Sequence, residues 1–81
     1  MINCDDYDYI EIVCLYRYPI KLTTKSGAFI EGVALDVTLN ESRMECIKMK
    51  VGGSDVSVLL DELTKLEVQV ENPHFSEINF V

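Results

Sequence analysis

The sequence has no tryptophan, one histidine, and aromatic residues at only 9% of its 81 positions. Its hydrophobic core must therefore be built mainly from aliphatic side chains. A chain of this length forms one domain and buries only about 60–65% of the surface that its unfolded form exposes. Little volume is left for a deep substrate cleft. We expect a single domain over residues 1–81 that is not an enzyme.

Cysteines are few, and their pattern argues against a disulfide framework. Cys4, Cys14 and Cys46 are odd in number and show no CxxC spacing, which favours a reducing compartment. No apolar run approaches the roughly 18–20 residues that cross a bilayer. Asp5 and Asp6 lie where a signal peptide would carry basic residues. We therefore expect a cytoplasmic protein without membrane contact, in which Cys14 and Cys46 are buried as small hydrophobic residues.

Positive charge is scarce: 7 Lys and Arg stand against 14 Asp and Glu, for a formal net charge of −7. Four acids and one base give residues 1–19 a net charge of −3, and three acids without a base give residues 66–81 the same value. Seven acids and six bases leave residues 20–65 at −1. Binding a phosphate backbone normally needs a basic stripe, so the chain ends are poor nucleic-acid ligands. A basic protein surface is the more natural partner, although acidity for solubility alone accounts for the charge equally well.

Residues 5–16 are predicted to form a short amphipathic helix. Ile10, Val13 and Cys14 follow the i, i+3, i+4 spacing of a buried face, and Tyr7 extends this stripe toward the N-terminus. The helix is too short to be stable alone in water. Its apolar face must therefore rest on the remainder of the domain.

Four acidic side chains crowd the N-terminal half of this helix: Asp5, Asp6, Asp8 and Glu11. Like charges this close repel one another, so they persist most readily where a basic partner, a helix N-terminus or a metal compensates them. Helix capping can occupy one or two of the four, but not all of them. We therefore predict a charged surface that is presented to another macromolecule.

Pro19 ends the predicted helix, and from residue 20 the hydrophobic period changes from 3.6 to 2, which is typical of strands. Strands are expected at residues 20–24, 29–36, 44–51, 56–60 and 66–71, with a short last one at 78–81. Gly52–Asp55 is the clearest hairpin loop. This pattern predicts an α+β fold that is mainly β: a small, strongly curved antiparallel sheet or open barrel, with the helix over an open end or one face. The element order is also that of the Sm-like fold.

No pattern of residues indicates catalysis. A metal-binding or phosphoryl-transfer role for Asp5, Asp6 and Asp8 would need ligands from elsewhere in the fold, and His74 is the only histidine. The chain has no Gly-rich phosphate loop, Ser–His–Asp set or zinc spacing. We therefore predict no catalytic residue, metal or cofactor, and we expect His74 to be exposed in the acidic C-terminal segment.

The segment Ile2–Asp8, followed by Glu11 and Cys14, closely resembles the start of the Rho-binding antiterminator (Rof) family. The Lys25–Gly27 turn and Asp36 also follow that family's pattern, so the resemblance covers nearly the whole chain. It implies an Sm-like fold and a protein that binds the hexameric bacterial termination factor Rho. It further implies that the protein occupies the RNA-binding N-terminal domain of Rho and blocks the primary site by which Rho grips RNA.

The resemblance also implies a set of Rho-binding residues. Tyr7, Asp8 and Glu11 would face Rho, with Asp5 and Asp6 adding charge or capping the helix. A second contact would come from the loop at residues 40–43, through Ser42 and Arg43. Here the sequence departs from the family, because Glu41 lies beside Arg43 where the family's stretch can be more basic.

Electrostatics agrees with this implication, since an acidic helix with exposed tyrosines can compete with RNA for a basic surface. Two alternatives stay open. The six bases in residues 20–65 allow an Sm-like RNA-binding protein that acts in RNA handling. A structural or metal-binding acidic domain is the third interpretation.

Overall fold

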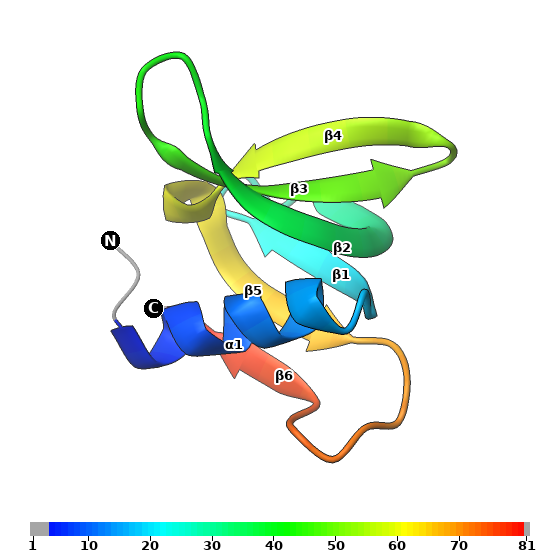
Figure 1. The fold of residues 1–81 in the computed structure, drawn as a ribbon. Coiled ribbons are helices and arrows are strands. Elements are labelled where there is room, and N and C mark those ends of the chain that lie inside the picture. Colours follow the sequence, from blue (N-terminus) through cyan, green and yellow to red (C-terminus); the bar gives the residue numbers. More distant parts are fainter. Residues whose placement is uncertain (1–3, 81) are drawn as a thin grey trace.

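The computed structural model describes residues 4–80 and contains one α-helix, one turn of 3-10 helix and six strands (Figure 1). In chain order these elements are α1 (Cys4–Leu15), β1 (Pro19–Thr24), β2 (Phe29–Leu39), β3 (Glu45–Val51), β4 (Ser54–Leu59), η1 (Leu60–Glu62), β5 (Leu63–Val68) and β6 (Glu77–Asn79). The predicted helix is confirmed and begins and ends one residue earlier than expected. A strand is present for each predicted one, although β5 begins and ends three residues earlier than expected, and residue 81 of the predicted last strand lies outside the described residues.

The strands form one antiparallel sheet in the order β4-β3-β2-β1-β5-β6. Figure 1 shows that the sheet bends strongly, with α1 lying across it. Two register shifts accompany the bend, one between Thr23 and Thr24 and one between Ala34 and Asp36. The predicted curved antiparallel sheet is confirmed. It stays open, with β4 and β6 at its edges, and does not close into a barrel.

Gly32 allows β2 and β3 to approach closely. A Cβ atom at this position would lie 2.4 Å from the backbone oxygen of Lys50, which no real Cβ atom tolerates. At the far end of β3, Gly52 and Gly53 form the two-residue turn of the hairpin, with φ of 55° and 85°. Both values lie in the left-handed region that glycine adopts without strain.

The core lies between α1 and the sheet. Ile10 and Val13 are fully buried, and Cys14 is nearly so, which confirms the predicted apolar stripe of the helix. Their partners in the core are aliphatic or sulfur-containing side chains from the sheet and η1: Ile20, Leu22, Ala34, Ile47, Met49, Val58, Leu60, Leu63 and Leu66. Cys14 and Cys46 are both free and buried, as expected. Across the described part of the chain, no helix combines the length and apolar character needed to cross a membrane.

Backbone hydrogen bonds from the residues that follow α1 cap its C-terminal end. The Tyr18 amide donates to the Val13 carbonyl at 3.0 Å, and the Arg17 amide donates to the Cys14 carbonyl at 3.3 Å. Arg17 has a φ of 53°, so it occupies the left-handed position that usually holds glycine after a helix. Pro19 then begins β1, which confirms that the helix ends before it.

Candidate protein-binding surface

Three acidic side chains lie along the outward side of α1. Asp5, Asp8 and Glu11 are three residues apart, so they share one side of the helix, and all three are exposed. Asp6 is half-buried and interacts with other groups of the protein. Because Ile10 faces the core, the helix presents its negative charge to solvent rather than to the sheet.

Tyr7 lies where two surface hollows meet. One hollow, of about 560 Å³, opens between α1 and β2 and is lined by Tyr7, Glu11, Cys14, Leu15, Arg17, Leu35, Asp36 and Val37. The other, of about 260 Å³, opens beside the β2–β3 loop and is lined by Tyr7, Arg43, Met44, Glu45, Leu59, Leu60 and Asp61. The half-buried Tyr7 ring therefore links the acidic helix to that loop.

The electrostatic environment of these hollows is negative. A hydrogen bond to the Glu45 side chain, together with burial and the charges of Glu45 and Glu11, raises the pKa of Tyr7 to about 12. Burial and, next, the carboxylate of Asp36 raise the pKa of the Cys14 thiol to about 11, while Arg17 opposes the shift. Both groups are therefore neutral near pH 7 and keep their protons.

The β2–β3 loop is held in one shape by Asn40. Its side-chain oxygen accepts hydrogen bonds from the Ser42 amide at 2.8 Å and from the Met44 amide at 3.0 Å. The Asn40 carbonyl accepts a third bond, from the Arg43 amide at 2.9 Å. Arg43 has a φ of 60°, which turns the chain back toward β3. The loop is thus a fixed turn whose last residues line the smaller hollow.

The structure brings together part of the predicted set. Tyr7 and Glu11 line the larger hollow, and Tyr7 and Arg43 line the smaller one, so the predicted helix and loop lie next to each other. Three other members, Asp5, Asp8 and Ser42, are exposed and line neither hollow. Ser42 lies at the turn of the loop, where its backbone is bonded to Asn40.

Glu45 is the residue that sequence reasoning missed. It is the first residue of β3, it lines the smaller hollow together with Tyr7, and it is the main cause of the raised pKa of Tyr7. No local pattern marks it, because an acid at the start of a strand is ordinary. Only the packing of α1 beside the β2–β3 loop makes it a partner of Tyr7.

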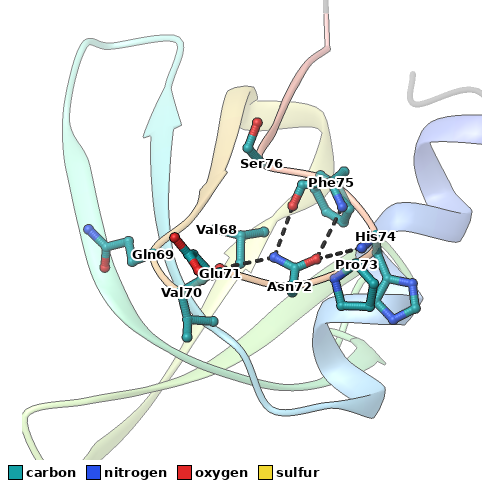
Figure 2. A pocket seen from close by; sticks show the side chains of 9 residues that line it. All are labelled: Val68, Gln69, Val70, Glu71, Asn72, Pro73, His74, Phe75 and Ser76. Carbon is teal, nitrogen blue, oxygen red and sulfur yellow. Dashed lines mark hydrogen bonds between the residues drawn. The ribbon is translucent and has the colours of Figure 1, made fainter.

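A third hollow, of about 640 Å³, lies along the β5–β6 loop and is lined by Val68–Ser76 (Figure 2). Asn72 organises this loop. Its side chain donates to the carbonyls of Val70 and Phe75 and accepts from the amides of His74 and Phe75, at 2.8–3.1 Å. Figure 2 shows these bonds converging on the amide group. The polar groups of Asn72 are therefore used in shaping the loop.

His74 is exposed, as predicted, and its ring stacks on Tyr16 with the centroids 5.0 Å apart. Tyr16 in turn stacks on Tyr18 at 5.5 Å. The three rings form one cluster at the C-terminal end of α1. Within residues 4–80, no three His, Cys, Asp or Glu side chains are grouped so as to hold a metal ion.

Known proteins resemble this chain in sequence and in fold. The sequence profile of the family described as "Modulator of Rho-dependent transcription termination (ROF)" matches residues 1–80. The proteins named "Protein rof" from Escherichia coli (strain K12) and Shigella flexneri are each 30% identical over 63 residues, which cover 78% of this chain and 74% of each relative. The solved structure titled "YaeO bound to Magnesium from Vibrio cholerae O395" has a TM-score of 0.88 and 43% identity, and the match covers 93% of this chain and 97% of that one. On these matches, the chain belongs to the ROF family of modulators of Rho-dependent transcription termination.

Proposed function

We propose that this protein binds the termination factor Rho and blocks its primary RNA-binding site, so that Rho-dependent termination is inhibited. Binding would use α1, through Asp5, Asp6, Tyr7, Asp8 and Glu11, and the neighbouring loop residues Ser42 and Arg43. No chemistry is needed, because occupancy of the RNA site is enough to exclude RNA.

The observation that carries this proposal is the arrangement of α1 in a protein of this family. Its acids point to solvent along one side, and Tyr7 stands between them and the β2–β3 loop. An RNA-binding surface is basic by necessity, and carboxylates can take the positions of phosphates on it. The half-buried tyrosine adds an aromatic face beside those charges.

The alternative of direct RNA binding finds little support in the distribution of bases. Lys48 and Lys50 both pair with Asp55, at 3.5 Å and 3.2 Å. Lys65 lies between Glu67 and Glu77, at 3.8 Å and 3.6 Å. Three of the six bases in residues 20–65 are therefore matched by nearby acids, which weakens the case for a basic stripe that binds a phosphate backbone.

Purified Rho and this protein, mixed without RNA, test the proposal directly. We expect a complex that competes with labelled single-stranded RNA and that reduces termination in a transcription assay. Binding should weaken markedly between about 0.1 M and about 1 M salt, where the Debye length falls from about 10 Å to about 3 Å. A complex insensitive to salt, or one that still binds RNA at the primary site, would contradict the proposed mechanism. RNA binding by this protein alone would favour the Sm-like RNA-binding alternative.

A further inference from the structure

Three aromatic rings meet at the C-terminal end of α1, and one of them keeps a ring face open. Tyr16 stacks on His74 at 5.0 Å and on Tyr18 at 5.5 Å, with the ring planes at 25° and 20°. The centroids of His74 and Tyr18 are only 6.2 Å apart. Rings on opposite faces of Tyr16 would be separated by nearly the sum of the two stacking distances, so both lie against the same face. The other face carries neither ring, and Tyr16 is 52% exposed.

Tyr16 lies on the same side of the helix as the acids. Its amide still donates to the Ile12 carbonyl at 3.1 Å, so helical geometry places it. It follows Asp5 by eleven residues, about three helical turns. Leu15, which is 72% exposed, follows Asp8 by seven residues, about two turns. The outward side of α1 therefore carries acids along its length and an exposed apolar and aromatic end.

The open face of Tyr16 suits a flat partner group. Because His74 and Tyr18 already pack against the ring from behind, it loses little further side-chain freedom when another ring stacks on its front. Proteins that bind single-stranded nucleic acid place aromatic side chains along a positively charged groove, and the bases stack on these rings. Such a groove attracts the acids of α1 and offers its aromatic side chains to Tyr16. Charge and ring therefore match one kind of surface.

We propose that Tyr16 is a base-mimicking contact to Rho. Its open ring face stacks on an aromatic side chain of the primary RNA-binding site, where a nucleobase of the RNA would otherwise lie. The contact continues the proposed surface beyond the acids and adds to it a component that does not depend on charge. This inference rests on the proposed function.

Substitution of Tyr16 by leucine and by phenylalanine tests the ring face. Leucine keeps apolar bulk but has no planar face, so we expect Tyr16→Leu to weaken binding to Rho by about three- to tenfold. Tyr16→Phe keeps the face and should bind within about twofold of the wild type. Chemical denaturation of each variant gives its folded fraction, to which the dissociation constant is referred.

Phe29→Leu is the matched control, because it makes the same kind of change at another exposed aromatic residue. Phe29 is 63% exposed, and the Lys21 ammonium lies 4.4 Å from its ring centroid. Lys21 alternates along β1 with the buried Ile20 and Leu22, so Phe29 lies on the face of the sheet away from α1 and the core. We expect Phe29→Leu to bind Rho like the wild type.

The salt dependence of the variants distinguishes stacking from charge. The Debye length falls from about 10 Å at about 0.1 M salt to about 3 Å at about 1 M, which weakens the contribution of the acids. The ratio of the dissociation constant of Tyr16→Leu to that of the wild type should stay the same over this range. The corresponding ratio for Asp8→Ala should shrink. A ratio for Tyr16→Leu that shrinks in the same way would contradict a stacking contact.

The outcomes separate this inference from the proposed function. Wild-type protein that fails to bind Rho overturns the proposed function and the role of Tyr16 with it. Normal wild-type binding, combined with equal dissociation constants for Tyr16→Leu and Phe29→Leu, overturns only the role of Tyr16. Equal losses in Tyr16→Leu and Tyr16→Phe overturn it as well, because the hydroxyl and not the ring face would then make the contact. Binding of labelled single-stranded RNA to this protein alone, lost in Tyr16→Leu, would show that the ring stacks on bases and does not replace them.

Discussion

Phe75 packs edge-on against Tyr9, with the ring centroids 4.7 Å apart and the ring planes at 62°. This contact joins the β5–β6 loop to the middle of α1. The stacking of His74 on Tyr16 makes a second junction at the end of the helix. A helix of twelve residues is marginal alone in water, so these junctions help the sheet to hold in place the element that carries the acids.

Replacing Phe75 by alanine should therefore weaken the domain. The ring is partly buried against the core, and its loss removes apolar contacts together with the edge contact to Tyr9. We expect Phe75→Ala to lower the free energy of unfolding by about 1–3 kcal/mol, measured by chemical denaturation. Glu71→Ala, at an exposed position of the same loop, should change it by no more than about 0.5 kcal/mol. Equal stability of the two variants would show that the loop adds nothing to the packing of α1.

Gly32→Ala tests the close approach of β2 and β3. The new methyl group would meet the Lys50 carbonyl, so the two strands would have to separate locally. We expect a loss of about 1–3 kcal/mol in the free energy of unfolding, as overpacking commonly costs. Ser57→Ala, on the exposed face of β4, is the control and should stay within about 0.5 kcal/mol of the wild type. A fully stable Gly32→Ala protein would contradict the tight spacing of these strands.

Alkaline pH should destabilise the fold through Cys14 and Tyr7. Burial raises the pKa of Cys14 from 9.0 to about 11, and the hydrogen bond to Glu45 raises that of Tyr7 from 10.0 to about 12. The folded state therefore binds these protons more tightly than the unfolded state. Their stabilising effect is complete below pH 9 for the thiol and below pH 10 for the phenol, and it is lost as pH rises through the folded values.

We accordingly expect the denaturation midpoint to fall between about pH 9 and about pH 12. Tyr7→Phe should flatten the upper part of this decline, because phenylalanine has no proton to release. A Tyr7→Phe profile identical to that of the wild type would mean that the hydroxyl is not held in the folded protein.

The sequence predicts the helix and strands of this fold better than the tertiary contacts between them. Ile10, Val13 and Cys14 share one face only if the segment is an α-helix, so their spacing predicts the helix. All three are buried in the structure. The segments in which apolar and polar residues alternate, together with the Gly52–Gly53 turn, likewise indicate where the strands lie along the chain. Each of these signals depends only on residues that are close together in the sequence, so it can be interpreted without knowledge of the tertiary structure.

The pairing of Tyr7 with Glu45 could not be predicted in this way. It depends on the bend of the sheet and on the length of the β2–β3 hairpin, which together bring the loop beside α1. The stacking of His74 on Tyr16 has the same origin, because the two residues lie at opposite ends of the chain. Such contacts depend on tertiary packing, which leaves no pattern in either segment.

Removing divalent metal should leave this protein unchanged. The Vibrio cholerae relative is described as bound to magnesium, whereas residues 4–80 of this chain contain no grouping of three metal-binding side chains. We expect a chelator to alter neither the thermal midpoint nor the inhibition of Rho, and added magnesium to act only through ionic strength. A loss of either property on chelation, restored by magnesium but not by an equivalent amount of sodium salt, would revive a carboxylate metal site at Asp5, Asp6 and Asp8.

Substitutions on α1 should separate binding from folding. Asp8→Ala and Glu11→Ala remove exposed carboxylates, so we expect the free energy of unfolding to change by no more than about 0.5–1 kcal/mol. Each should nevertheless weaken binding to Rho by ~2–5 kcal/mol, the usual cost of truncating one partner of a charge pair across an interface. Inhibition of termination should decline in parallel.

Two control variants complete this test. Glu71→Ala removes an exposed carboxylate from the β5–β6 loop and should bind Rho like the wild type. Val68→Ala removes two methyl groups from a side chain packed on the core, so it should cost about 1–3 kcal/mol of folding while the folded protein still binds. If Asp8→Ala instead unfolds the domain, and the fraction that stays folded inhibits Rho normally, then Asp8 stabilises the helix and does not contact Rho. The acidic residues on the outward side of α1 would then be explained by their effect on folding alone.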